Sequence, residues 1–65
     1  MQVRGVEVLA VLEALERAPA LLSDLTEELG MPAKSVRAIL EALRKKGVVE
    51  RAESGFYYLK EGEGA

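Results

Sequence analysis

The chain has 65 residues, no cysteine, no histidine and a formal net charge of −2 at pH 7. A chain of this length forms one domain and buries only about 60% of the surface that its unfolded form exposes, so we expect a single copy to be marginally stable. Without cysteine, neither a disulfide framework nor a thiolate metal site can add stability, which favours self-association. No apolar run approaches the roughly 18 residues of a membrane span, and no secretory signal pattern occurs, so a cytoplasmic location is expected.

The residue types that carry most enzyme chemistry are missing. Without histidine and cysteine, the chain lacks the commonest general base, the thiol nucleophile and most transition-metal ligand sets. No glycine-rich phosphate loop followed by Lys and Ser or Thr occurs. The sequence therefore predicts no enzyme, no catalytic residue, no metal site and no cofactor.

Opposite charges separate along the chain. Residues 1–30 carry two basic and six acidic side chains, a net −4, whereas residues 31–60 carry seven basic and three acidic side chains, a net +4. The clustering of basic residues, rather than the total charge, indicates a nucleic-acid surface. The alternative is that these charges only solvate the surface.

The first element predicted is a helix over about residues 3–17. Its expected core face consists of Val8, Leu9, Val11, Leu12 and Leu15. The helix is expected to end at Ala18-Pro19, because proline has no N–H and pushes the preceding residue out of helical geometry. A stripe of small apolar residues is expected on nearly the opposite side: Val3, Val6, Ala10 and Ala14. This stripe predicts a two-fold homodimer contact, unless these are surface residues without a role.

A helix-turn-helix is predicted next. Ser23 is expected to cap a short helix over about residues 24–29, and Gly30 to end it in the left-handed conformation. Pro32 then precedes a second helix over about residues 33–46. The core side of this second helix is settled by an apolar stripe of Val36, Ile39, Leu40 and Leu43.

The outward side of the second helix is the candidate DNA-reading surface. Residues near the N-terminus of such a helix reach base edges, and the candidates are Lys34, Ser35, Arg37, Ala38 and Glu41. Arg37 is the strongest of them, because a guanidinium can bind guanine at two atoms, worth about 1–3 kcal/mol of discrimination. Lys34 and Ser35 could equally contact phosphate. Arg44 and Lys45 are phosphate candidates whose interaction with the helix dipole is the alternative explanation.

A hairpin is predicted over about residues 48–59, with Ala52-Glu53-Ser54-Gly55 as its connection. Alternation places Tyr57 and Leu59 on the buried face. The side chains expected outside, as candidate DNA contacts, are Arg51, Phe56, Tyr58 and Lys60. Aromatic rings beside cations suit nucleic-acid contact, and exposed rings on an edge strand suit a protein interface equally well.

Three helices followed by a small antiparallel hairpin define a mainly α fold, the winged helix-turn-helix, over residues 1–60. Residues 61–65, rich in glycine and glutamate, are expected to form a flexible tail.

Three segments carry a resemblance to a known family: VRGVEVLAVLEAL, LSDLTEELGMPAKSVRAILEALRKKGVVER and SGFYYLKEG. They resemble the N-terminal DNA-binding domains of IclR-type transcription factors and, more loosely, the MarR and ArsR regulator types. The IclR-type reading helix usually begins with lysine after the proline and carries arginine in its middle turn. Here Ala33 and Ala38 stand at those positions, with Lys34 and Arg37 beside them.

Two functions follow from these expectations. The first is a small dimeric transcriptional regulator that binds double-stranded DNA through the second helix of its helix-turn-helix. The alternative is a winged helix that docks on a transcription or replication protein through its acidic first helices or through Phe56 and Tyr58.

Overall fold

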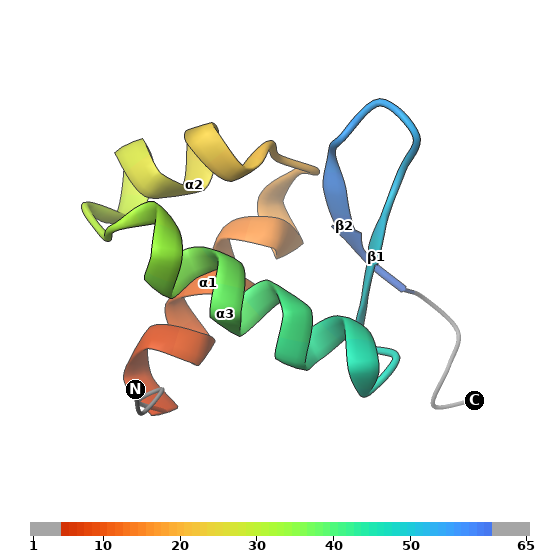
Figure 1. Cartoon of the computed structure of the whole chain (residues 1–65), viewed down its shortest axis with the longest axis horizontal. Helices are drawn as coiled ribbons and strands as arrows, with labels where there is room; N and C mark the ends of the chain where they lie inside the picture. The colour runs from red at the N-terminus through yellow and green to blue at the C-terminus, as the bar shows by residue number, and fades with distance from the viewer. Residues whose placement is uncertain (1–4, 61–65) are drawn as a thin grey trace.

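The structure, a computed structural model, describes residues 5–60 and consists of three helices followed by a two-stranded antiparallel sheet (Figure 1). The elements in chain order are α1 (Gly5–Arg17), α2 (Leu22–Leu29), α3 (Ala33–Lys45), β1 (Val49–Arg51) and β2 (Tyr57–Leu59). This is the winged helix-turn-helix that the sequence predicts, with β1, β2 and the turn between them as the wing. The expected tail, residues 61–65, and the dimer candidate Val3 lie outside the described residues.

The turn between α2 and α3 depends on glycine. Gly30 has a φ of 65° and a ψ of 31°, and its N–H donates to the carbonyl of Thr26 at 3.0 Å. Any side chain at this left-handed position would be strained, whatever space surrounds it. Pro32 follows with an extended backbone, and its carbonyl accepts the N–H of Val36 at 3.1 Å in the first turn of α3.

The start of α2 differs from the expectation. Leu21, with an extended backbone, is the N-cap residue, and Ser23 lies within the first turn. The predicted Ser23 cap is wrong because the Asp24 carboxylate reaches back and accepts the Leu21 N–H at 3.1 Å. This is the backward half of a capping box, and it starts the helix at Leu22.

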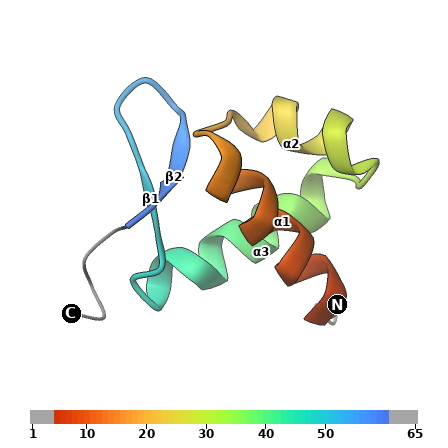
Figure 2. The same cartoon turned by 180° about the vertical axis from the view of Figure 1, so that it is seen from behind.

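The hydrophobic core lies between the three helices and the helix-facing side of the wing (Figures 1 and 2). Its largest fully buried side chains are Val11, Leu25, Val36, Ile39, Leu40 and Val49. α3 supplies three of them and contacts α1, α2 and β1, so the predicted core stripe of the second helix is confirmed. Figure 2 shows α1 crossing in front of α3, and α1 also packs against β2.

Two residues of α1 lie on the opposite side from their expected positions. Leu9, expected in the core, is 56% exposed, whereas Ala14, expected on the dimer stripe, is only 6% exposed and belongs to the core. The reason is helical geometry: at about 100° per residue, Leu9 lies about 200° from the buried Val11, and Ala14 only about 60° from it. The exposed apolar residues of α1 are therefore Val6, at 71%, and Leu9.

The wing pairs Val49 with Leu59, Glu50 with Tyr58 and Arg51 with Tyr57. Ala20, between α1 and α2, exchanges two backbone hydrogen bonds with Tyr57, of 3.0 and 2.7 Å, and so covers the other edge of β2 at this point. Tyr57 is buried and Leu59 half-buried, whereas Phe56 and Tyr58 are exposed, as alternation predicts.

We expect Leu40→Ala to lower the free energy of unfolding by about 2–5 kcal/mol, because it removes a fully buried side chain and leaves a cavity. The control is Lys45→Ala, which shortens an exposed side chain on the same helix and should change that free energy by no more than about 0.5 kcal/mol. Urea unfolding followed by circular dichroism measures both. Equal losses in the two variants would contradict this description of the core.

Candidate nucleic-acid interface

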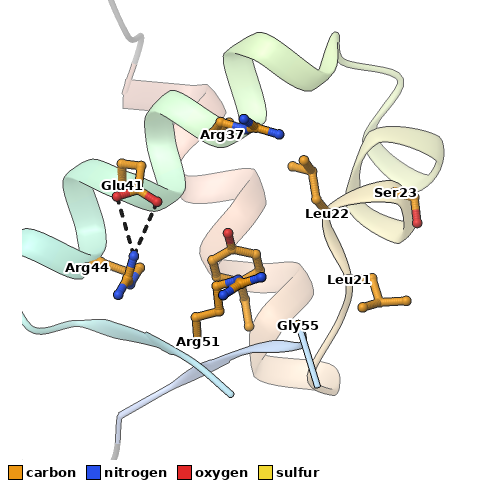
Figure 3. Close-up of a pocket in the computed structure, with 9 residues that line it drawn as sticks. Leu21, Leu22, Ser23, Arg37, Glu41, Arg44, Arg51 and Gly55 are labelled. Carbon is orange, nitrogen blue, oxygen red and sulfur yellow. Dashed lines mark hydrogen bonds and ion pairs between the residues drawn. The ribbon is translucent and has the colours of Figure 1, made fainter. Parts of the chain in front are cut away.

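An open groove of about 580 Å³ separates α3 from the start of α2 and from the wing (Figure 3). We call it the arginine groove. Its lining residues are Leu21, Leu22, Ser23, Arg37, Glu41, Arg44, Arg51, Gly55 and Tyr57. Three guanidinium groups from two different elements thus share one space, although they are separated by up to 14 positions in sequence.

The two arginines of α3 lie on the same side of the helix. Arg37 and Arg44 are seven residues apart, which is close to two full helical turns. Glu41 stands between them, about 40° around the helix from Arg37. The opposite side of α3 is buried in the core, so the burial of residues such as Val36 and Leu40 directs these three polar side chains outward.

Arg51 reaches the arginine groove from the wing. It pairs across the hairpin with Tyr57, and cross-strand partners lie on the same face of a sheet. Because Tyr57 is buried against the helices, Arg51 also lies on the helix-facing side, where its exposed side chain lines the groove. The expectation that Arg51 stands beside the outward rings of Phe56 and Tyr58 is therefore wrong.

Glu41 and Arg44 form an ion pair inside the groove. Arg44 Nη1 lies 3.3 Å from Glu41 Oε2 and 3.5 Å from Oε1, as the dashed lines in Figure 3 mark. Both side chains remain substantially exposed, so the pair contributes only about 0.2–0.5 kcal/mol to stability. The pair biases the carboxylate toward Arg44, and the groove carries three positive charges against one negative charge.

The other predicted DNA contacts lie outside the groove lining. On α3, Lys34 and Lys45 are exposed, whereas Ser35 and Ala38 are half-buried. On the wing, Lys60 is exposed, at the end of the hairpin. The structure brings together Arg37, Glu41, Arg44 and Arg51, and does not gather the remaining candidates around them.

Phe56 and Tyr58 face away from the groove. They alternate with Tyr57 along the chain and are 38% and 37% exposed. Tyr58 lines a separate depression with Leu15 and Pro19 at the end of α1. The rings therefore do not interleave with the arginines.

Sequence reasoning missed the walls of the groove. Leu21 and Leu22, at the start of α2, and Tyr57, on the wing, supply its apolar sides. The signal that could have found the first two is Asp24, whose spacing from Leu21 fits the backward half of a capping box. Nothing in the local pattern indicates that the start of α2 faces the wing.

Residues 5–60 contain neither a candidate membrane-spanning helix nor a candidate metal site. No helix within residues 5–60 combines the length and apolar character that crossing a membrane requires. Over the same residues, no three acidic side chains come together as a metal site would need.

Fold and groove together define a winged-helix domain of the kind found in DNA-binding regulators. The sequence profile of the MarR family matches residues 5–55, and the chain belongs to that family. The crystal structure of T. acidophilum IdeR is similar, with a TM-score of 0.68 and 25% sequence identity over 94% of this chain. The match covers 30% of the IdeR chain, so the present chain spans less than a third of that protein's length. No curated protein matches the sequence.

These comparisons confirm the winged-helix fold and the resemblance to the MarR type. The finer resemblance to IclR-type regulators is not confirmed, and neither comparison favours a protein-interaction module.

We expect the charged residues that line the groove to contribute little to the stability of the fold, and the buried residues that line it to contribute much more. Arg37→Ala should change the free energy of unfolding by at most about 0.5 kcal/mol, because the side chain is exposed. Tyr57→Ala, which removes a buried ring, should cost about 3–5 kcal/mol. Urea midpoints measured by circular dichroism test the difference. A large loss for Arg37→Ala would show that the guanidinium supports the fold.

Proposed function

We propose that this chain is a DNA-binding transcriptional regulator that places α3 in the major groove and a phosphate strand along the wing side of the arginine groove, beside Arg44 and Arg51. The observation that carries the proposal is the convergence of Arg37, Arg44 and Arg51 on one open groove beside α3. Membership of the MarR family supports it. The roles of individual residues are inferred from their positions on α3 and on the wing.

The size and position of α3 suit a reading helix. Its 13 residues extend about 20 Å, and the major groove, about 12 Å wide, admits an α-helix. Lys34 and Arg37 lie in its first turns, the part of a recognition helix that reaches base edges. Arg37 therefore contacts bases, with guanine as the preferred partner.

Arg51 and Arg44 flank the path proposed for the DNA backbone. Phosphate oxygens accept hydrogen bonds from guanidinium groups and from backbone N–H groups at helix N-termini, and such contacts fix the register of a protein on the duplex. The start of α2, at Leu22 and Ser23, borders the same groove. A strand lying between α3 and the wing thus meets donors from α2, α3 and β1.

The acidic side chains favour one orientation on DNA. Three exposed acidic residues of α2 line a depression: Asp24, Glu27 and Glu28. Arg17 also lines this depression, whereas the three arginines of the groove do not. Arg17 is paired with Glu28 there. Because this surface repels phosphate, only the side formed by α3 and the wing is attracted to DNA.

The direct test is fluorescence anisotropy of a labelled random-sequence duplex titrated with the chain over a series of salt concentrations. We expect binding that weakens steeply with salt, since each neutralised phosphate adds about 0.9 to the slope of log K against log salt. Arg51→Ala should weaken binding to all sequences and reduce that slope by about one.

Arg17→Ala is the matched control. It also removes one arginine charge, but from the acidic depression beside α2 and not from the arginine groove. It should leave the slope unchanged. No binding of the parent chain at low salt, or equal losses for Arg17→Ala and Arg51→Ala, would overturn the proposal.

We also propose that two copies pair through the exposed side of α1. Regulators of this family commonly dimerise, and Val6 and Leu9 present apolar side chains there. Of the four residues expected at this contact, Val6 is exposed, Ala10 is half-buried and Ala14 is excluded by its burial. A symmetric dimer would place its two reading helices on half-sites about one helical turn apart.

We expect Val6→Glu to convert the chain from dimer to monomer in sedimentation velocity, because it buries an unpaired charge in the contact. Ala18→Glu, at an exposed position just after α1, controls for the added charge and should leave the mass unchanged. A monomeric parent chain, or a Val6→Glu variant that still dimerises, would contradict the contact.

A further inference from the structure

The arginine groove contains one side chain that a merely phosphate-binding surface would lack. Glu41 lies one turn after Arg37 on α3, and Arg44 Nη1 holds its carboxylate at 3.3 and 3.5 Å. Its side chain remains 48% exposed, so it is available to a ligand in the groove. A carboxylate at this position repels phosphate, and it therefore favours binding only where a base offers it a hydrogen-bond donor.

Few base edges can satisfy a carboxylate in the major groove. Guanine presents the acceptors N7 and O6, and thymine presents the acceptor O4, so both repel it. Adenine presents a donor beside the acceptor N7, which suits an amide better than a carboxylate. Cytosine presents the N4 amino group, a donor that Glu or Asp can accept from.

We infer that Glu41 is a specificity-determining residue that selects cytosine in the recognised site. The inference rests on the DNA-binding function proposed above and deepens it by naming part of the sequence read. Glu41 lies about 6 Å along the helix axis from Arg37, and stacked base pairs are 3.4 Å apart. This rise is less than two base-pair steps, so the cytosine read by Glu41 is expected within about two base pairs of the guanine bound by Arg37.

Arg44 acts here as a positioning residue. Its pairing favours orientations of the carboxylate toward Arg44 before DNA binds, which slightly lowers the conformational entropy that Glu41 loses on binding. Only Nη1 is used in the pair, and a guanidinium has five N–H donors. The remaining donors can reach phosphate while the pair persists, so the same arginine anchors the backbone and orients the reader.

The experiment is selection of binding sites from a random duplex library by the full chain, carried out in parallel with Glu41→Gln and Glu27→Gln. The parent chain should enrich sites with a cytosine at a fixed distance from a guanine, with about tenfold preference at the cytosine position. Glu41→Gln should shift that position to adenine, because glutamine binds adenine N6 and N7 together. Glu27→Gln, an exposed glutamate of α2 outside the groove, should retain the parent preference.

A further variant tests whether the cytosine preference depends on the Glu41 carboxylate itself or on its ion pair with Arg44. Arg44→Gln breaks the pair but keeps the carboxylate, so it should weaken binding to all sequences while cytosine stays preferred. Identical sites for the parent chain and Glu41→Gln would overturn the inference and leave DNA binding intact. Failure of the parent chain to bind any duplex in the anisotropy titration would overturn the proposed function and this inference together.

Discussion

One side of α3 is buried against α1, α2 and β1, and this burial determines where the polar side chains of α3 lie. Val36, Ile39, Leu40 and Leu43 are at most 7% exposed, and together they fix the rotation of α3 about its own axis. A rotation of even a quarter turn would bring charged side chains into the core, where an unpaired charge is very costly. The buried stripe therefore directs the side chains of Arg37, Glu41 and Arg44 outward on one side of the helix.

The wing and the start of α2 give this oriented helix a second wall. Ala20 binds Tyr57 through two backbone hydrogen bonds, so the segment between α1 and α2 is tied directly to β2. The same tie brings Leu21 and Leu22 beside the wing residues that face the helices. Arg51 completes the groove because it is the cross-strand partner of Tyr57. The groove is thus a consequence of sheet pairing as much as of the helix-turn-helix.

Local patterns in the sequence were sufficient for the order and type of the elements. Gly30, Pro32 and the apolar stripe of α3 each specify a feature that depends on near neighbours, and each was predicted correctly. The errors at Leu9 and Ala14 came from α1, whose apolar residues occur all round the helix, so periodicity alone could not select the side that packs.

The candidate site was only partly predictable, for a different reason. Arg37, Glu41 and Arg44 could be identified from helical spacing, because all three lie on one element. Their meeting with Arg51 and Leu22 depends on contacts between elements distant in sequence, and hairpin alternation alone left the side occupied by Arg51 wrongly assigned. Net charge was equally uninformative, since an overall −2 conceals a basic groove on one side of the molecule.

Amide chemical shifts of the isotope-labelled chain, followed during a titration with duplex DNA, would show whether DNA occupies the arginine groove. We expect the largest changes in α3 around Arg37 and Glu41, at the start of α2 and around Arg51, while the amides on the exposed side of α1 change little. Changes concentrated on α1 or on the outer face of the wing, around Phe56 and Tyr58, would contradict DNA binding in the arginine groove.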